Sequence, residues 1–188
     1  MIKLYEAEIT DFSQADYTKQ YSLLECAIRE KIDAKQNQNS RLQSLAGYIL
    51  FYRAIDDLYS GKKAKITFNE HGKPMCDLCY FSISHSEERV VCVISDKPVG
   101  VDIQKIKEIT QRKNYKLFNQ KECDYVNQSC ELVSQRYIEV FTKKEAAVKM
   151  LGLTLSNGID INTFSDEFNF NITKKGDFIL CICCKACG

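Results

Sequence analysis

One carboxylate interrupts an otherwise apolar segment, Val99-Gly100-Val101-Asp102-Ile103, and this segment constrains the fold more than any other. Three β-branched residues at alternating positions, Val99, Val101 and Ile103, predict a buried strand. An aspartate in such a strand must be hydrogen-bonded, paired or bound to a metal, because burying an uncompensated charge is costly. The strand therefore predicts a partner for Asp102 elsewhere in the chain.

A second segment, residues 141–149, predicts a helix in which Glu145 and Lys149 lie one turn apart on the same face. If Asp102 and Glu145 come together, their carboxylates offer the hard oxygen ligands that Mg²⁺ prefers. Lys149 then offers a cation to the phosphate that usually accompanies Mg²⁺. The spacing alone leaves open a simpler interpretation, in which Asp102 caps a turn or pairs with a lysine.

Taken together, the two segments resemble the motifs of the 4′-phosphopantetheinyl transferases, in the single-chain form that activates peptide and polyketide synthetases. The family's strand, (V/I)-G-(V/I)-D-(I/V), corresponds to residues 99–103. Its helix, aromatic-(S/T/C)-x-K-E-(A/S)-x-x-K, corresponds to residues 141–149. Further stretches match in the family's order, at residues 72–74, 81–86 and 117–122. The resemblance covers roughly residues 40–183.

The resemblance implies an activity, a cofactor and partners. The expected enzyme transfers 4′-phosphopantetheine from coenzyme A to a serine of an apo acyl or peptidyl carrier protein, with Mg²⁺ as cofactor. Many family members carry a third acid two residues after the strand aspartate, where this chain has Gln104. An alternative is therefore a catalytically weakened relative that binds coenzyme A or a carrier protein.

The resemblance also implies roles for residues that match its motifs. Asp102, Gln104 and Glu145 are the expected metal site. The expected catalytic residues are Glu145, Lys149 and Glu122, because a serine hydroxyl needs a base near it to attack phosphorus. The family also has an arginine that contacts the 3′-phosphate of coenzyme A. Arg41 is the candidate for it here, although the alignment with the family's pattern is loose around this residue. Contacts to coenzyme A are expected from Arg41, Lys73, Pro74, Ser84, His85, Lys144 and Lys149.

Composition narrows the partners and the compartment. The chain has 188 residues, 45% of them hydrophobic and 27% charged, with a net charge of +1, so bulk charge favours neither nucleic acid nor an anionic membrane. Acidic residues at the N-terminus and the lack of a membrane-length apolar run lead us to expect a cytoplasmic protein. Because both halves of the family's fold are expected in one chain, we expect a monomer.

Ten cysteines are many for a cytoplasmic protein. Two C-x-x-C pairs, Cys76 with Cys79 and Cys184 with Cys187, have the spacing of a Cys₄ zinc site. Most of the cysteines lie inside apolar patterns, where a free thiol behaves as a small hydrophobic residue. Reduced thiols are therefore the favoured interpretation, and a zinc-dependent interaction module is the less favoured alternative.

The order of elements predicts an α+β fold. The resemblance adds two similar α/β halves in one chain, a pseudo-dimeric fold with the active site between the halves. We place the N-terminal half, which contributes to coenzyme A binding, at residues 1–98, and the C-terminal half, with the metal and catalytic motifs, at residues 99–188. The expected strands are 2–9, 65–68, 79–84, 89–95, 99–104, 167–173 and 177–184, and the expected helices are 15–31, 40–61, 111–128 and 131–151.

Overall fold

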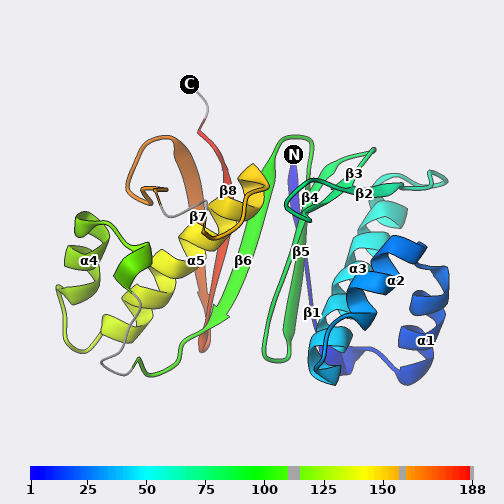
Figure 1. Cartoon of the computed structure of the whole chain (residues 1–188), viewed down its shortest axis with the longest axis horizontal. Coiled ribbons are helices and arrows are strands. Elements are labelled where there is room, and N and C mark those ends of the chain that lie inside the picture. The colour runs from blue at the N-terminus through cyan, green and yellow to red at the C-terminus, as the bar shows by residue number, and fades with distance from the viewer. Residues whose placement is uncertain (110–114, 157–159, 187–188) are drawn as a thin grey trace.

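The computed structural model describes residues 1–109, 115–156 and 160–186, and it is a mixed α+β fold with two three-stranded antiparallel sheets (Figure 1). In the first sheet, β5 is central and pairs with β1 on one edge and β4 on the other. The strands predicted at residues 79–84 and 89–95 are thereby confirmed, and they pair as a hairpin. The strands of this sheet are β1 (Ile2–Glu8), β4 (Tyr80–Ser86) and β5 (Arg89–Ser95).

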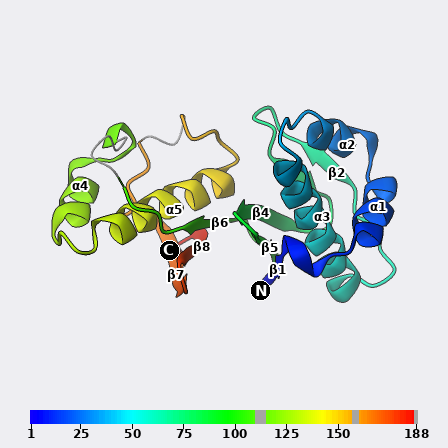
Figure 2. The ribbon, with the colours of Figure 1, turned by 90° about the horizontal axis from the view of Figure 1, so that it is seen from below.

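Helix α3 (Gln38–Leu58) packs across the first sheet, and two shorter helices pack on the other side of α3 (Figure 2). Expecting a single helix at 15–31 was wrong, because the chain forms α1 (Gln14–Leu23) and α2 (Cys26–Asp33). The break lies at Leu24, whose extended backbone (φ −69°, ψ 144°) places its side chain in the core. Burial of this one side chain accounts for the interruption of the helical pattern.

A small two-stranded sheet, β2 (Ile66–Phe68) with β3 (Pro74–Cys76), projects beside α3 (Figure 1). Its turn is held by Asn69, whose Oδ1 accepts the amides of His71 (3.1 Å) and Lys73 (2.8 Å). Gly72 has a φ of 79°, a conformation that favours glycine. The predicted strand at 65–68 and the turn after it are confirmed, whereas β3 was not predicted.

The second sheet has the order β6-β8-β7, and helix α5 (Val133–Leu151) packs on β6 and β8. Helix α4 (Gln120–Asn127) packs in turn against α5. The predicted helix at 111–128 is shorter than expected, with a 3-10 turn at Tyr115–Leu117 before α4, and residues 111–114 lie outside the described ranges. The strands are β6 (Val99–Lys105), β7 (Phe168–Lys175) and β8 (Phe178–Lys185).

The two sheets share one connectivity. In each, the first strand pairs with the last strand of a later hairpin, and a long helix lies between them in the chain. Thus β1, α3, β4 and β5 follow the same order as β6, α5, β7 and β8. Among the helices of the three described ranges, none is both long enough and apolar enough to cross a bilayer.

Strands β4 and β6 lie next to each other, and serine side chains join them where the two sheets meet. Alternate residues of a strand point to the same face, so the three serines of β4 all face β6. We call these three serines the serine seam. Their hydroxyls accept β6 amides in register: Ser82 from Val101 (3.1 Å), Ser84 from Ile103 (3.3 Å) and Ser86 from Lys105 (3.0 Å).

The two faces of β6 have different partners. Val99, Val101 and Ile103 are fully buried and pack with valines of β5, so one apolar cluster spans both sheets. On the opposite face, a Cβ atom at Gly100 would lie 1.9 Å from the carbonyl oxygen of Ala146. Helix α5 therefore rests directly on the backbone of β6, and the face that carries Asp102 points toward this helix.

Candidate active site

Asp102 pairs with a lysine, Lys149, as the simpler interpretation of the sequence had it, and two further side chains join them. Asp102 is 1% exposed, and its Oδ1 accepts hydrogen bonds from Lys149 Nζ (2.7 Å) and Ser84 Oγ (2.7 Å). Its Oδ2 accepts one from Gln104 Nε2 (3.1 Å). Ser84 Oγ also accepts from Lys149 Nζ at 2.9 Å. We call Ser84, Asp102, Gln104, Glu145 and Lys149 the Asp102 cluster.

Glu145 belongs to this cluster through charge rather than through a hydrogen bond. It lies on α5 one turn before Lys149 and is half-buried. Burial is the main cause that raises the pKa of its carboxyl, the negative charge of Asp102 adds to it, and Lys149 opposes it. Within the described residues the Glu145 carboxylate has no hydrogen bond or ion pair. The charges of Asp102 and Glu145 thus repel each other, and a bound cation would relieve this repulsion.

The donor set of the cluster fits a hard cation. Asp102 and Glu145 supply carboxylate oxygens, and Gln104 keeps its carbonyl oxygen as an acceptor while its amide nitrogen binds Asp102. Mg²⁺ needs few protein ligands because it retains several waters. In residues 1–109, 115–156 and 160–186, no group of three His, Cys, Asp or Glu side chains is placed to hold a metal ion. The cluster therefore offers two carboxylates and an amide.

Basic residues surround the cluster on the side of β4. Lys149 and Lys73 both line a pocket of about 220 Å³, together with Ser82 of the serine seam. His85 is half-buried, and its pKa is lowered to about 4 chiefly by burial and then by the charges of Lys149 and Lys35, which outweigh the opposing effect of Asp102. The histidine is therefore neutral at neutral pH. The positive charge that could receive an anion on this side of the cluster comes from Lys73 and Lys149.

Lys73 connects the β2–β3 turn to the end of α5. Its Nζ donates to the carbonyl of Met150 (3.1 Å), and Asn69 Nδ2 donates to the carbonyl of Gly152 (2.8 Å). Both acceptors lie at the C-terminal end of α5, where the backbone carbonyls carry partial negative charge. Burial lowers the pKa of Lys73. Pro74, the next residue, begins β3 and lines the same pocket as Lys73.

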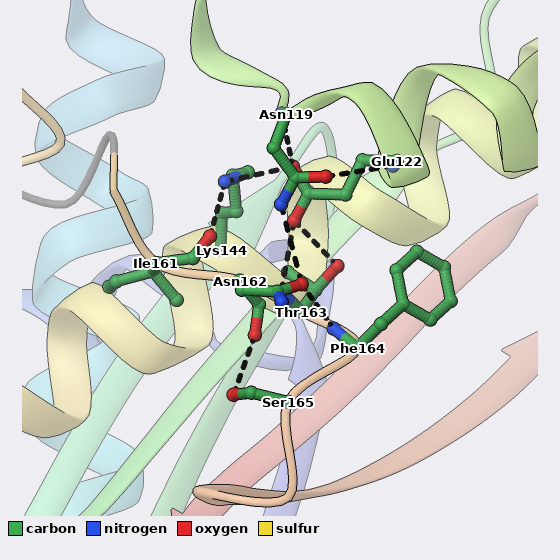
Figure 3. Close-up of polar contacts among 8 residues, drawn as sticks. All are labelled: Asn119, Glu122, Lys144, Ile161, Asn162, Thr163, Phe164 and Ser165. Atoms are coloured by element: carbon green, nitrogen blue, oxygen red, sulfur yellow. Dashed lines mark hydrogen bonds and ion pairs between the residues drawn. The ribbon is translucent and has the colours of Figure 1, made fainter.

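Glu122 and Lys144 form a buried ion pair at a different place in the same half (Figure 3). Their side chains are 0% and 1% exposed, and Glu122 Oε2 lies 3.0 Å from Lys144 Nζ. The same oxygen accepts the Asn119 amide (2.9 Å), while Oε1 accepts the amide (2.9 Å) and hydroxyl (2.8 Å) of Thr163. Lys144 also donates to the carbonyl of Ile161. The pair joins α4, α5 and the segment before β7.

The remaining predicted residues have other partners. Arg41 donates to the carbonyls of Lys35 (2.7 Å) and Asp33 (3.0 Å), at the C-terminal end of α2. Cys184 Sγ contacts the carbonyl of Asn169, and Cys187 lies outside the described residues. The roles predicted for Arg41, Glu122 and Lys144 stay predictions.

The structure adds one role that the motifs did not indicate. The resemblance assigns Ser84 to coenzyme A, whereas the structure shows its hydroxyl fully used by Asp102, Lys149 and the Ile103 amide. Ser82 and Ser86 were not singled out. The alternating serines at 82, 84 and 86 are the signal in the sequence that could have indicated a polar seam.

Comparisons with known proteins agree with this geometry. Residues 98–184 match the family model of the 4′-phosphopantetheinyl transferase superfamily. The chain is 33% identical over 132 residues to the 4′-phosphopantetheinyl transferase gsp of Aneurinibacillus migulanus, covering 68% of this chain and 55% of that protein. It is 29% identical over 154 residues to the 4′-phosphopantetheinyl transferase Sfp of Bacillus subtilis strain 168, covering 79% and 69%.

The chain therefore spans between about half and about two thirds of the length of these curated relatives, 55% of the first and 69% of the second. The family model covers β6, α4, α5, β7 and most of β8, which are the elements that carry Asp102, Gln104, Glu145 and Lys149. On these matches, the chain is similar to the 4′-phosphopantetheinyl transferase superfamily, most directly over residues 98–184.

Proposed function

We propose that this protein transfers the 4′-phosphopantetheine group of coenzyme A to a serine hydroxyl of an apo acyl or peptidyl carrier protein. The observation that carries the proposal is that Asp102 and Glu145 are close enough for the charge of Asp102 to raise the pKa of Glu145, with Lys149 Nζ 2.7 Å from Asp102 Oδ1. A cation and a phosphate are the two ligands that this charge pattern would accept together. The relatives named above are 4′-phosphopantetheinyl transferases, which supports the same reaction.

In this proposal Asp102, Gln104 and Glu145 hold Mg²⁺, which when bound would neutralise the pyrophosphate and the charge that develops on the leaving oxygen. Lys149 lies 28% exposed at the 220 Å³ pocket, so its ammonium can donate to a phosphate oxygen without leaving Asp102. Lys73 at the same pocket and the nearby His85 are the residues proposed to position the nucleotide, His85 at the 3′-phosphate.

The serine hydroxyl needs a proton acceptor, and two glutamates were predicted for this role. We propose Glu145, acting directly or through a water, because its carboxylate has no hydrogen bond or ion pair among the described residues and its pKa is raised toward neutrality. Glu122 is fully buried, and both of its oxygens already accept hydrogen bonds. Those contacts support a structural role for Glu122.

The arrangement of the chain supports a pseudo-dimeric fold, with halves at 1–98 and 99–188. The two sheets share one strand order, and Val99 is the first residue of β6. The Asp102 cluster draws Ser84 from the first half and the other members from the second. Because a single chain supplies both sides of the cluster, we propose that the protein acts as a monomer in the cytoplasm.

The test is an incubation of the purified protein with coenzyme A, Mg²⁺ and a panel of apo carrier proteins, followed by intact mass spectrometry. We expect a gain of one phosphopantetheine on at least one carrier, with release of adenosine 3′,5′-bisphosphate. No gain on any carrier of the panel would contradict the proposal.

A weakened relative is the second candidate, and one observation favours it. Gln104 stands where many members of the family have an acid, so the cluster offers one negative charge fewer to the metal. Calorimetric titration with coenzyme A separates the two candidates. Mg²⁺-dependent binding without transfer to any carrier would support the weakened relative.

A further inference from the structure

Two thiols that the proposed function does not use lie at a cavity beside the first sheet. This cavity has a volume of about 540 Å³ and lies where β3 leads into β4. Cys76, the last residue of β3, and Cys79, the residue before β4, both line it. Both residues therefore border a cavity of a size that admits small molecules, and they have C-x-x-C spacing.

The local contacts favour the thiolate of Cys76. Its sulfur accepts a hydrogen bond from the Leu78 amide at 3.4 Å, and the Cys79 thiol and amide also donate to it. These donors, with the Cys79 thiol first, lower the pKa of Cys76. Burial and Asp77 oppose them, since the Cys76 thiol also donates to Asp77 Oδ1 at 3.6 Å, but the donors outweigh both. A thiolate at neutral pH is the reactive form in exchange with disulfides.

Cys79 has the complementary properties. It is 9% exposed, and its hydrogen bond to Cys76, together with burial, raises its pKa well above the usual range. Cys76 is more open and more acidic, so the first attack falls to Cys76. Cys79 lies within hydrogen-bonding contact of Cys76, which is the position of a second, resolving thiol.

We propose that Cys76 and Cys79 form a thiol–disulfide exchange site that takes a low-molecular-weight disulfide from the cavity. The Cys76 thiolate attacks one sulfur of the small disulfide, forming a mixed disulfide and breaking the original S–S bond, and the first small thiolate leaves and takes up a proton. Cys79 then loses its proton and attacks the Cys76 sulfur, which releases the second thiolate. Two protein thiols are oxidised by two electrons, and one small disulfide is reduced to two thiols.

The charges at the cavity fit a zwitterionic ligand of this class. Lys73, Asp77 and Asp96 are all among the residues that line it. Asp77 is held in place because its Oδ1 accepts the Lys65 amide at 2.9 Å. Glutathione disulfide carries both ammonium and carboxylate groups, so it can meet both kinds of charge and is the probe of choice.

Cys26 provides the matched control. It is exposed, as a reactive thiol should be, but it donates to Glu30 Oε1 at 3.3 Å, and this contact raises its pKa. Exposure alone therefore predicts modification of Cys26, whereas the contacts described above predict modification of Cys76. Digestion with trypsin separates the two, because Cys76 and Cys79 are the only cysteines in residues 66–89.

The experiment treats the full-length protein with glutathione disulfide at neutral pH, quenches with acid and locates the products by peptide mass. We expect the wild type to form a Cys76–Cys79 disulfide. Cys79→Ser should instead retain one glutathione on Cys76, because it lacks the resolving thiol. In Cys76→Ser the modification of peptide 66–89 should fall at least about tenfold, since Cys79 is buried and its thiol is protonated. Cys26→Ser should behave as the wild type.

Two results would overturn the proposal. One is glutathione on Cys26 at a rate equal to or above that at Cys76; the other is a Cys79→Ser variant that retains no glutathione on Cys76. Circular dichroism of each variant checks its fold. The pH dependence of Cys76 alkylation in the unmutated protein gives a second, independent measurement. If the pH of half-maximal reactivity equals or exceeds the pKa of an ordinary cysteine thiol, the proposal is also refuted.

Discussion

Ser84 Oγ donates a hydrogen bond of 2.7 Å to Asp102 Oδ1, and this contact crosses the serine seam from β4 of the first sheet to β6 of the second. The same hydroxyl accepts the Ile103 amide and the ammonium of Lys149. One small side chain on β4 therefore fixes the carboxylate of β6 and the cation of α5. Because Ser84 is only 4% exposed, water cannot easily replace these contacts.

We predict that Ser84→Ala lowers the free energy of unfolding by about 1–3 kcal/mol, because it leaves a buried amide and a buried carboxylate each without one partner. Urea unfolding measures this loss. Ser86→Ala is the matched control, since Ser86 accepts only the Lys105 amide at the less buried end of the seam. Equal losses in the two variants would show that the contact to Asp102 contributes nothing beyond the seam itself.

Asp102→Asn should reduce the rate of phosphopantetheine transfer at least about a hundredfold, the scale found when one electrostatic contact to a developing charge is lost. The substitution keeps the size of the side chain and removes its charge. Asp124→Asn, at an exposed position on α4, is the control and should retain the wild-type rate. Turnover near the wild-type rate in Asp102→Asn with Mg²⁺ would show that Asp102 is structural only.

Glu145→Gln should stabilise the metal-free protein at pH 7 while it removes transfer activity. The pKa of Glu145 is raised by burial and by Asp102, so the folded state favours the protonated form. The contribution of this group to stability is therefore present in full below the usual glutamate pKa and is lost as the pH rises through the raised pKa. Glutamine at position 145 has no such loss.

Thermal unfolding between pH 4 and pH 7.5 in a chelating buffer measures this effect. The difference between Glu145→Gln and the wild type should grow as the pH rises, and added Mg²⁺ should raise the melting temperature of the wild type alone. Glu131→Gln, at an exposed position, serves as the control. A difference that does not change with pH would contradict the raised pKa.

Glu122→Gln should destabilise the fold by about 3–5 kcal/mol, because it removes the carboxylate that pairs with the buried charge of Lys144. The double variant Glu122→Gln/Lys144→Met removes both charges and should recover part of this loss. Chemical denaturation measures both values. If Glu122 were instead the catalytic base, the single variant would lose activity at unchanged stability and its pH–rate profile would lose the acidic limb.

Local patterns were sufficient for most of the fold. The β-branched alternation of residues 99–103 and the apolar spacing of residues 131–151 report directly on which face is buried, and both elements form as predicted. The helix expected at 15–31 divides because Leu24 is held in the core by residues distant in the chain. The pattern of residues next to Leu24 in the sequence carries no information on that long-range contact.

Less of the geometry of the candidate site could be predicted. An aspartate in an apolar strand required a partner, and Lys149 is one of those found. By contrast, Glu122 stands among polar residues that resemble a solvated helix face, and its burial against Lys144 depends on how α4, α5 and the segment before β7 pack. The contact of Ser84 with Asp102 likewise arises only when β4 and β6 lie side by side.

Gln104→Glu tests the place of Gln104 beside the metal. Gln104 Nε2 lies 3.1 Å from Asp102 Oδ2, so a carboxylate at this position would add a negative charge next to the proposed cation. We expect the Mg²⁺ concentration for half-maximal rate to fall, because the added charge attracts the cation, while the rate at saturating Mg²⁺ stays similar.

In the absence of Mg²⁺ the same variant should be less stable than the wild type. The new carboxylate would face Asp102 and Glu145 with only Lys149 to offset them, and it would lose the hydrogen bond that the amide donates. Thermal unfolding with and without Mg²⁺ separates this effect from catalysis. A variant with an unchanged Mg²⁺ requirement and unchanged metal-free stability would refute the placement of Gln104 at the metal, while leaving the assignment of Asp102 and Glu145 intact.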